Sequence, residues 1–280
     1  MTRRPSPRAA VAAIVGSAFQ MEMLDGLAVT PIDVTTPWGP WTLHHVDVAA
    51  GPAYVSFRHG YPHRLLPNQV PYRAQAWALK QVGCSALLVT SSVGILDAAL
   101  PLYQPLLVGD LLTLDNRLPG GEACTMFPHP DPAHGHLVLN EGLFSIALTQ
   151  QVAALARGTG DVPVAEVVFG YAGGPRTKTP AENRMWRLLG AQVNSMTVGP
   201  EVVLANELEI PCAAAVVGHK YSVPDIEAPP DEGAIAETLV RSRSTLGRLV
   251  RIFLEQAVPV AFGNHLFRFQ APTVTEKQAQ

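Results

Sequence analysis

Short runs of apolar residues recur along the chain of 280 residues, and each run is bounded by glycine, proline or polar residues. Apolar runs of about four to eight residues are typical of strands that are buried on both faces of a sheet. The runs that predict strands are "AAVAAIVG", "AYVSFRHG", "CSALLVTSSVG", "DLLTLDN", "EVVFGYAGG", "AQVNSMTV" and "CAAAVVGH".

Segments with the apolar spacing of a helix follow several of these strands. They are "PYRAQAWALKQVG", "EGLFSIALTQQVAALARG", "PAENRMWRLLG" and "GPEVVLANELE". A last helix is predicted near residues 231–256, where an acidic start suits a helix N-terminus. Strands that alternate with helices predict an α/β fold in which helices flank a central mixed β-sheet. We expect a single domain over residues 1–280, with flexible tails at 1–9 and 270–280.

One segment has no periodicity. Residues 119–136, "PGGEACTMFPHPDPAHGH", contain four prolines and three histidines and predict a long surface loop. Such loops often carry functional residues in α/β enzymes.

Composition narrows the class of partner. The chain is 48% hydrophobic and 15% charged, and its formal net charge of −3 provides no basic surface of the kind that binds nucleic acid. No stretch reaches the roughly 18 apolar residues of a membrane span. The apolar run from Ala9 to Val15 is too short for a signal peptide. We therefore expect a cytoplasmic protein that binds a small molecule or another protein.

The cysteines do not suggest a metal site or a disulfide framework. Cys84, Cys124 and Cys212 are odd in number, and their spacing fits neither arrangement. We interpret those inside apolar runs as buried thiols.

Polar residues gather where the predicted strands end, which is where ligands bind in open α/β sheets. These residues are Gly16 and Ser17; Arg58, His59 and Gly60; Thr90, Ser91 and Ser92; Met196 and Thr197; and Gly218, His219 and Lys220. A guanidinium, imidazoles, hydroxyls and backbone amides all donate hydrogen bonds to anions, and none of them requires a metal. The pattern predicts an anion site, with phosphate as its natural occupant.

Two segments carry a resemblance to a known family. "FRHGYPHRLLPNQVPYRAQAWALKQVGCSALLVTSSVGIL" and "GAQVNSMTVGPEVVLANELEIPC" closely resemble the trimeric purine nucleoside phosphorylases, and among them the methylthioadenosine phosphorylase branch. The resemblance implies a nucleoside phosphorylase fold and a pentosyltransferase of nucleoside salvage that uses no metal or organic cofactor. Inorganic phosphate, the co-substrate, would attack the anomeric carbon and release the free base and ribose 1-phosphate.

The resemblance also implies an assembly and assigns the phosphate and sugar ends of a site. It implies a homotrimer, with a hexamer as the alternative, in which the loop around Met126, Phe127 and His136 completes a neighbour's site. His63 matches a position at the sugar edge, and Met196 matches the residue under the ribose. The residues that match phosphate-binding positions are Ser17, Arg58, His59, Ser91, Ser92 and Thr197.

Taken singly, these residues have simpler interpretations. Arg58 beside His59 would also suit a structural ion pair, and a serine or threonine after a strand often caps a helix.

The base end departs from the family pattern. In "AGGPRTKTPAE", Thr177 stands where the family has an aromatic residue, and Lys178 stands where purine nucleoside phosphorylases have a glutamate. Gly218, His219 and Lys220 stand where methylthioadenosine phosphorylases have aspartates. We assign Thr177, Lys178, Gly218 and His219 to base binding.

These residues change what the pocket can bind. A buried donor without a partner costs about 1–3 kcal/mol, so we expect a base with carbonyl or carboxylate oxygens, a 6-oxopurine in preference to a 6-aminopurine. His219, with the near-neutral pKa of imidazole, would protonate the leaving nitrogen, and Lys220 would be the second catalytic residue. In the alternative, Lys178 and Lys220 face solvent or pair with Glu182 and Asp225.

The 5′ substituent of the sugar is left open. Pro230, Asp231 and Glu232 precede or begin the last helix. The two carboxylates would suit a 5′-hydroxyl better than an apolar methylthio group, but they would also cap the helix.

The leading hypothesis is therefore a nucleoside phosphorylase with an altered base preference. The alternatives are a methylthioadenosine phosphorylase with unusual base contacts, a nucleosidase in which water replaces phosphate, and a nucleoside-binding homologue without turnover.

Overall fold

The computed structural model describes residues 9–158, 160, 163, 165–223 and 232–268, with the backbone alone over 232–242. The strands are β1 (Ala10–Val15), β2 (Val29–Val34), β3 (Trp41–Val48), β4 (Gly51–Phe57), β5 (Cys84–Ile95), β6 (Pro105–Thr113), β7 (His136–Val138), β8 (Glu166–Tyr171), β9 (Val193–Ser195), β10 (Cys212–Tyr221) and β11 (His265–Phe267). The helices are α1 (Tyr72–Gln81), α2 (Ile146–Gly158), α3 (Pro180–Leu188), α4 (Gly199–Glu207) and α5 (Glu232–Gln256), with short 3-10 turns at Met21–Leu24 and Pro67–Gln69.

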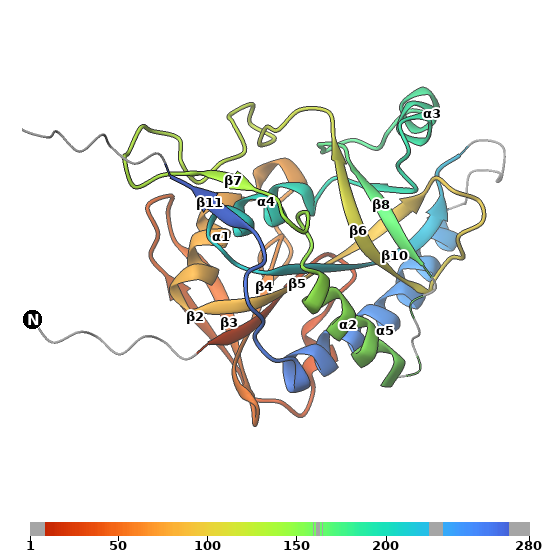
Figure 1. Cartoon of the computed structure of the whole chain (residues 1–280). Helices are drawn as coiled ribbons and strands as arrows, with labels where there is room; N and C mark the ends of the chain where they lie inside the picture. The colour runs from red at the N-terminus through yellow and green to blue at the C-terminus, as the bar shows by residue number, and fades with distance from the viewer. Residues whose placement is uncertain (1–8, 159, 161–162, 164, 224–231, 269–280) are drawn as a thin grey trace, which may run out of the picture.

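The strand β5 organises the sheet. In the described residues the sheet has nine strands in the order β10-β6-β8-β9-β5-β1-β4-β3-β2, and β10 also pairs with β5. A closed ring of strands therefore forms from β5, β10, β6, β8 and β9. The remaining strands extend the sheet outward from β5 in the order β1, β4, β3 and β2 (Figure 1). Parallel and antiparallel pairs both occur, so the predicted mixed sheet is confirmed.

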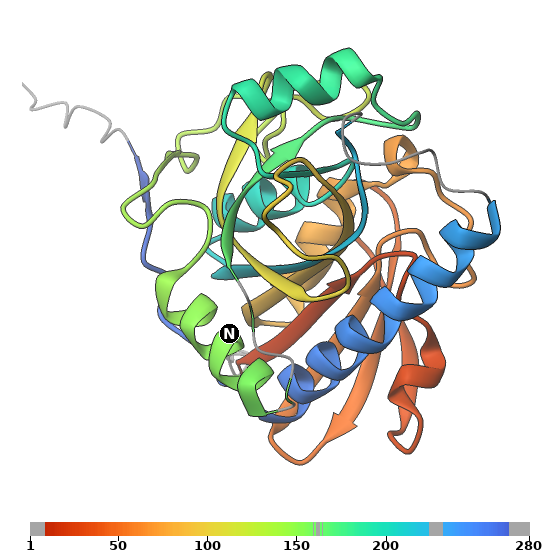
Figure 2. The ribbon, with the colours of Figure 1, turned by 90° about the vertical axis from the view of Figure 1, so that its right-hand side faces the viewer.

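Helices cover both faces because alternate residues of the central strands point in opposite directions. Ile14 and Val89 pack into a core layer with α1 and α4, whereas Val15 and Leu88 pack into a second layer with α2 and α5. Figure 2 shows α5 running across the second of these faces, with α2 beside it. The predicted helical cover is confirmed.

The elements predicted from apolar runs are all present, but the edge pair β2 and β3 was not predicted. Strand β2 contains Pro31 and Asp33, and β3 contains His44 and His45, so neither strand forms a continuous apolar run. Both lie at the outer end of the sheet, where one face is only partly covered.

The region 119–136 is irregular, as predicted, but it is not wholly a surface loop. Cys124 and Met126 are buried in the core layer that contains α1 and α4, and Phe127 packs against it. The carboxylate of Glu207, at the end of α4, accepts hydrogen bonds from the Thr125 hydroxyl and from the backbone N–H of Met126. The Met126 side chain lies in the core of its own chain and is not available to a neighbouring subunit, whereas the contribution of the loop as a whole to a neighbour's site stays a prediction.

Within the described part of the chain, no helix is both long enough and apolar enough to cross a bilayer.

The position of β5 predicts a large effect of truncating its side chains. Leu87 is fully buried in the layer beneath α1 and α4. We expect Leu87→Ala to lower the free energy of unfolding by about 2–5 kcal/mol, through lost burial and a cavity, measured by urea denaturation at one protein concentration. The control Leu188→Ala, in a residue that is 87% exposed on α3, should change it by less than about 0.5 kcal/mol. Equal effects of the two substitutions would contradict the assigned core.

Candidate active site

A cavity of about 280 Å³ lies where the loops after β1 and β4 meet β5, β9 and β10. It is lined by Gly16, Ser17, Arg58, His59, Pro67, Ser91, Ser92, Gly94, Thr177, Lys178, Asn183, Asn194, Ser195, Met196, Thr197, His219, Lys220 and Ser222. The structure thus brings together all the predicted phosphate-binding residues, Met196, and the predicted base-end residues except Gly218.

Arg58 forms the floor of one end of this cavity. Its side chain is 1% exposed, and its Nε and Nη2 atoms donate to the two carboxylate oxygens of Glu201 at 2.6 and 2.8 Å. Nη2 also donates to the Thr90 carbonyl at 2.9 Å. The simpler interpretation of Arg58 as half of an ion pair is therefore correct, but the partner is Glu201 and one nitrogen remains.

That remaining nitrogen, Nη1, lies beneath Gly16. A Cβ atom at Gly16 would come within 2.7 Å of Arg58 Nη1. The glycine at the end of β1 is therefore needed for close approach of the guanidinium. Nη1 is the donor of Arg58 that is left for a ligand.

Glu201 also shapes the turn that carries Thr197. The backbone N–H of Val198 donates to Glu201 Oε2 at 2.9 Å. Val198 has φ 75° and ψ −52°, close to the strained form of the γ-turn. A β-branched residue with positive φ is a genuine outlier, and such strain persists only where the surroundings enforce it. The carboxylate thus fixes both Arg58 and the Thr197 turn.

Hydroxyl groups cluster beside the guanidinium. Ser91 Oγ lies 3.3 Å from Thr197 Oγ1 and 3.4 Å from Ser195 Oγ. These distances exceed the usual 2.7–2.8 Å of hydroxyl hydrogen bonds. Ser92 Oγ is buried without a hydrogen-bond partner. Because these mutual bonds are weak, the hydroxyls can turn to an anionic oxygen at little cost.

His59 is a neutral acceptor at the same end. Its Nδ1 atom lies 2.8 Å from the Leu65 carbonyl oxygen, so Nδ1 carries the proton and Nε2 has the lone pair. Burial, the charge of Arg58 and the neighbouring His63 together lower the pKa of His59 to about 4, although the Leu65 carbonyl opposes this. The ring of His63 stacks on that of His59 with centroids 4.5 Å apart.

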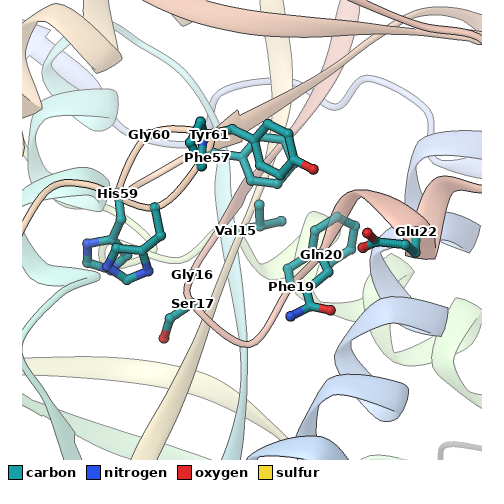
Figure 3. A pocket seen from close by; sticks show the side chains of 12 residues that line it. Val15, Gly16, Ser17, Phe19, Gln20, Glu22, Phe57, His59, Gly60 and Tyr61 are labelled. Carbon is teal, nitrogen blue, oxygen red and sulfur yellow. The ribbon is translucent and has the colours of Figure 1, made fainter.

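His63 lines a second cavity, of about 260 Å³, that shares Gly16, Ser17 and His59 with the first. Figure 3 shows this cavity, with Phe57 and Tyr61 on one side, Phe19 on another, and His59 next to Ser17. His63, the predicted sugar-edge residue, therefore lines the cavity with aromatic walls and stacks on His59, which lines both cavities.

A β-bulge brings His219 and Lys220 into the cavity. Gly218 pairs with Val93 and Lys220 with Gly94, so His219 is an extra residue in β10. In a regular strand, consecutive side chains point to opposite faces, and a bulge re-aims them. Here both His219 and Lys220 line the cavity.

Gly218 does not line the cavity. It is buried, its carbonyl accepts from the backbone N–H of Tyr103 at 2.9 Å, and a Cβ atom would lie 2.4 Å from Ile95 Cδ1. The structure gives it a packing role.

Lys178 also faces the cavity. The predicted alternative, an ion pair with Glu182, is wrong, because that carboxylate binds the Arg176 guanidinium at 2.7 and 2.8 Å and caps α3 through Thr179 N. Burial and the charge of Lys220 lower the pKa of Lys178 to about 8, against the opposing effect of Glu182. The other predicted partner, Asp225, lies outside the described residues.

His219 differs from the expectation of a near-neutral imidazole. Burial, then the charges of Lys220 and Lys178, lower its pKa to about 4, and its Nδ1 is buried without a partner. An imidazole with this pKa is neutral at pH 7 and can donate one hydrogen bond, but it is a poor source of protons. Lys178, with a pKa near the working pH, is better matched to that task.

Several lining residues were not predicted. Asn194 donates through Nδ2 to Asn183 Oδ1 at 2.9 Å, and Asn194 Oδ1 is buried without a partner. Asn194 and Ser195 lie in the predicted strand "AQVNSMTV", where two polar residues inside an apolar run were the available signal. Glu201 stood in the quoted segment "MTVGPEV", but nothing in the sequence links it to Arg58, 143 positions away.

Pro230 and Asp231 lie outside the described residues, and so does the side chain of Glu232. In the described part of the chain, no group of three or more His, Cys, Asp or Glu residues could hold a metal ion.

Comparison with known proteins identifies the family. Residues 10–255 match the model of the phosphorylase superfamily. The chain belongs to this superfamily. As a member of the phosphorylase superfamily it is an enzyme of the pentosyltransferase class.

Similar proteins carry different specificities in their names. A probable S-methyl-5′-thioinosine phosphorylase of Methanopyrus kandleri is 34% identical over 209 residues, 74% of this chain and 76% of that protein. A purine nucleoside phosphorylase of Streptomyces coelicolor is 35% identical over 209 residues, 72% of each chain. The fold of this superfamily member also matches a solved mutant adenosine/methylthioadenosine phosphorylase of Schistosoma mansoni in complex with adenine, with a TM-score of 0.77, 23% identity, and coverage of 88% of this chain and 90% of that one.

The buried ion pair predicts a strong effect on stability. Glu201→Ala leaves the Arg58 guanidinium buried without its counter-ion and releases the Val198 N–H. We expect a loss of about 3–5 kcal/mol in the free energy of unfolding, measured by urea denaturation. Asp115→Ala is the control, since the pair of Arg117 and Asp115 is solvent-exposed and should contribute less than about 1 kcal/mol. A loss no larger than in the control would contradict the role assigned to Glu201.

The proximity of the two lysines predicts a coupled titration. We expect the pKa of Lys178, followed by carbon NMR at its Cε position, to be about 8 and to rise in Lys220→Met, because a neighbouring positive charge is removed. The control Arg187→Met, on the exposed side of α3, should leave the value unchanged. An unchanged pKa in Lys220→Met would show that the two ammonium groups do not share the cavity.

Proposed function

We propose that this enzyme is a nucleoside phosphorylase that cleaves the N-glycosidic bond of a 6-oxopurine nucleoside with inorganic phosphate. The observation that carries this proposal is the distribution of hydrogen-bond donors along the described walls of one cavity. Arginine and hydroxyl donors lie at one end, lysine and histidine donors lie at the other, and none of the lining residues that the structure describes is Asp or Glu.

The first end suits a phosphate ion. Arg58 offers Nη1, and the hydrogen bonds of the Ser91 hydroxyl, to Thr197, Ser195 and the Ser92 carbonyl, are all long, at 3.2–3.4 Å. His59 Nε2 can accept a hydrogen bond from the hydroxyl group of a monoanionic phosphate. Charge-assisted bonds of this kind are shorter and stronger than neutral ones, and a nucleosidase would leave these donors without a function.

The reaction follows from the two ends. A phosphate oxygen forms a bond to the anomeric carbon, the bond from that carbon to N9 of the purine breaks, and its electron pair passes into the base. A proton at N7, from Lys178 or from water, completes the neutral free base. Donors aimed at the base stabilise the negative charge that develops there, which is the largest single contribution in many enzymes.

The second end favours a carbonyl at C6. Lys178 and Lys220 are donors without acceptors in the part of the chain that the structure describes, and His219 can donate one hydrogen bond. A 6-amino group would place its own N–H bonds against these donors, and a polar site discriminates strongly when its groups are left unpaired. The names of the similar proteins include thioinosine, purine nucleoside and methylthioadenosine phosphorylases, so the choice rests on the chemistry of this pocket.

A 5′-methylthio group is a second candidate feature of the substrate. The cavity next to His63 has walls from Phe19, Phe57, Tyr61 and Pro62. Such walls favour an apolar 5′ substituent over a hydroxyl, which supports methylthioinosine beside inosine.

Assembly as a homotrimer, a cytoplasmic location and the absence of a cofactor stay predictions from the sequence.

The decisive experiment compares four nucleosides. Inosine, methylthioinosine, adenosine and methylthioadenosine are incubated with the purified enzyme, with and without phosphate, and free base and sugar 1-phosphate are measured. We expect phosphate-dependent release from the oxo nucleosides, at least about tenfold faster in kcat/KM than from the amino nucleosides. Equal or faster cleavage of methylthioadenosine would favour the amino-base alternative. Base release without phosphate would indicate a nucleosidase, and ligand binding without product a silent homologue.

The phosphate end predicts a separate effect on KM. Thr197→Val removes a hydroxyl from the cavity, and we expect the KM for phosphate to rise about tenfold to a hundredfold, from about 1.5–3 kcal/mol for a hydrogen bond to a charged group. Steady-state kinetics at saturating nucleoside measure this. Thr149→Val, in α2 and away from the cavity, removes a buried hydroxyl that has no partner and should leave KM unchanged. An unchanged KM in Thr197→Val would remove the hydroxyl from the phosphate site.

A further inference from the structure

Two lysine ammonium groups share the base end of the cavity without a counter-ion. In the described part of the chain neither Lys178 nor Lys220 has a hydrogen bond or a salt bridge, and both line the cavity. Glu182, the carboxylate that acts on Lys178 from α3, is held by Arg176. The positive charge of Arg58, at the other end, is balanced by Glu201. Within the described residues, the base end therefore carries a positive charge that no carboxylate balances.

This charge lies away from the phosphate end. Lys220 pairs with Gly94 on β5, whereas Ser91 pairs with Val216. Three residues along a strand separate Gly94 from Ser91, or about 10 Å at about 3.3 Å per residue. Lys220 is therefore placed to act on the base rather than on the attacking phosphate, and Lys178 lies close enough to Lys220 for their charges to interact.

The hydrogen-bonding groups at this end match one kind of base. Lys178, Lys220 and His219 supply donors, and Asn194 Oδ1 is a buried acceptor without a partner. A purine with carbonyl groups at C2 and C6 ionises readily, because the negative charge spreads over both oxygens and the ring nitrogen between or beside them. Its anion presents several acceptors to the donors, and its remaining N–H can be donated to Asn194. A 2-amino group would instead point N–H bonds at an ammonium.

On these grounds, and resting on the proposed phosphorolysis, we propose that the base end is an anion site that selects an acidic dioxopurine nucleoside, with Lys178 as the residue that determines the selection. The two ammonium groups bind the ionised base and also stabilise the charge that it gains as the glycosidic bond breaks. Like charges held together are costly, and an anionic ligand relieves this repulsion.

The test uses xanthosine, inosine and guanosine as substrates of the full-length enzyme at pH 7 with saturating phosphate. We expect kcat/KM for xanthosine to exceed that for inosine at least about tenfold, with guanosine the poorest of the three. In Lys178→Met the ratio of xanthosine to inosine should fall at least about tenfold, and Lys178→Arg should restore part of it because the charge is retained. The matched control Arg187→Met removes a positive charge from the exposed side of α3 and should leave the ratio unchanged.

A pH profile separates this role from a purely structural one. The charged groups that act on Lys178 are Lys220 from β10 and Glu182 from α3, the latter held by Arg176, and Lys178 in turn acts on His219 of β10. As the pH rises through about 8, Lys178 loses its proton, so the preference for xanthosine should decline, and this decline should be absent in Lys178→Met. In Lys220→Met the decline should move to higher pH.

The outcomes distinguish this inference from the proposed function. Phosphate-dependent cleavage of inosine without a preference for xanthosine would overturn the acidic-base assignment and leave phosphorolysis standing. A rise in the KM for phosphate in Lys178→Met, with an unchanged nucleoside ratio, would reassign the lysine to the phosphate. No phosphate-dependent cleavage of any of the three nucleosides would contradict the proposed function itself.

Discussion

The buried pair of Arg58 and Glu201 is the constraint on which the rest of the site depends. One carboxylate binds the guanidinium at the end of β4 and the strained backbone at Val198 before α4. It therefore joins two segments that are far apart in the sequence and sets the distance between a cation and a hydroxyl. A buried ion pair contributes little net stability compared with apolar packing. Its value here is geometric, since it holds one guanidinium nitrogen and one threonine at the same wall of a cavity.

The two ends of the cavity handle charge in opposite ways. At the end near Ser91, the positive charge of Arg58 is neutralised within the protein, and neutral hydroxyls and a neutral imidazole surround it. At the end near Lys220, the two lysines have no counter-ion among the described residues, and burial together with the charge of Lys220 lowers the pKa of Lys178 to about 8. The repulsion between the lysines is a cost to the folded protein. Sites that bind or stabilise charge commonly accept such a cost, which is why shifted pKa values gather at functional sites.

The sequence predicted most of the fold because the central strands are buried on both faces and read as apolar runs. It did not predict β2 and β3, because edge strands with Pro31, Asp33 and two histidines resemble loops. The members of the cavity were largely predicted from polar residues near strand ends. The roles were less predictable: the pairing of Arg58 with Glu201 and the low pKa of His219 depend on contacts between distant segments and on burial, which no local pattern records. Met126 shows the same limit, because its irregular surroundings suggested a surface position and the core layer under α1 and α4 enclosed it.

The bulge at His219 has a consequence for how this enzyme could change over evolutionary time. Because two consecutive positions of β10 line the cavity while Val217 and Gly218 stay packed, adjacent codons can vary the chemistry of the cavity wall without disturbing the interior. In a lineage with such a bulge, single-nucleotide changes at these two codons can alter which base is bound. The fold and the residues at the phosphate end stay the same. One inserted residue thereby allows substrate preference to change while the reaction itself is retained.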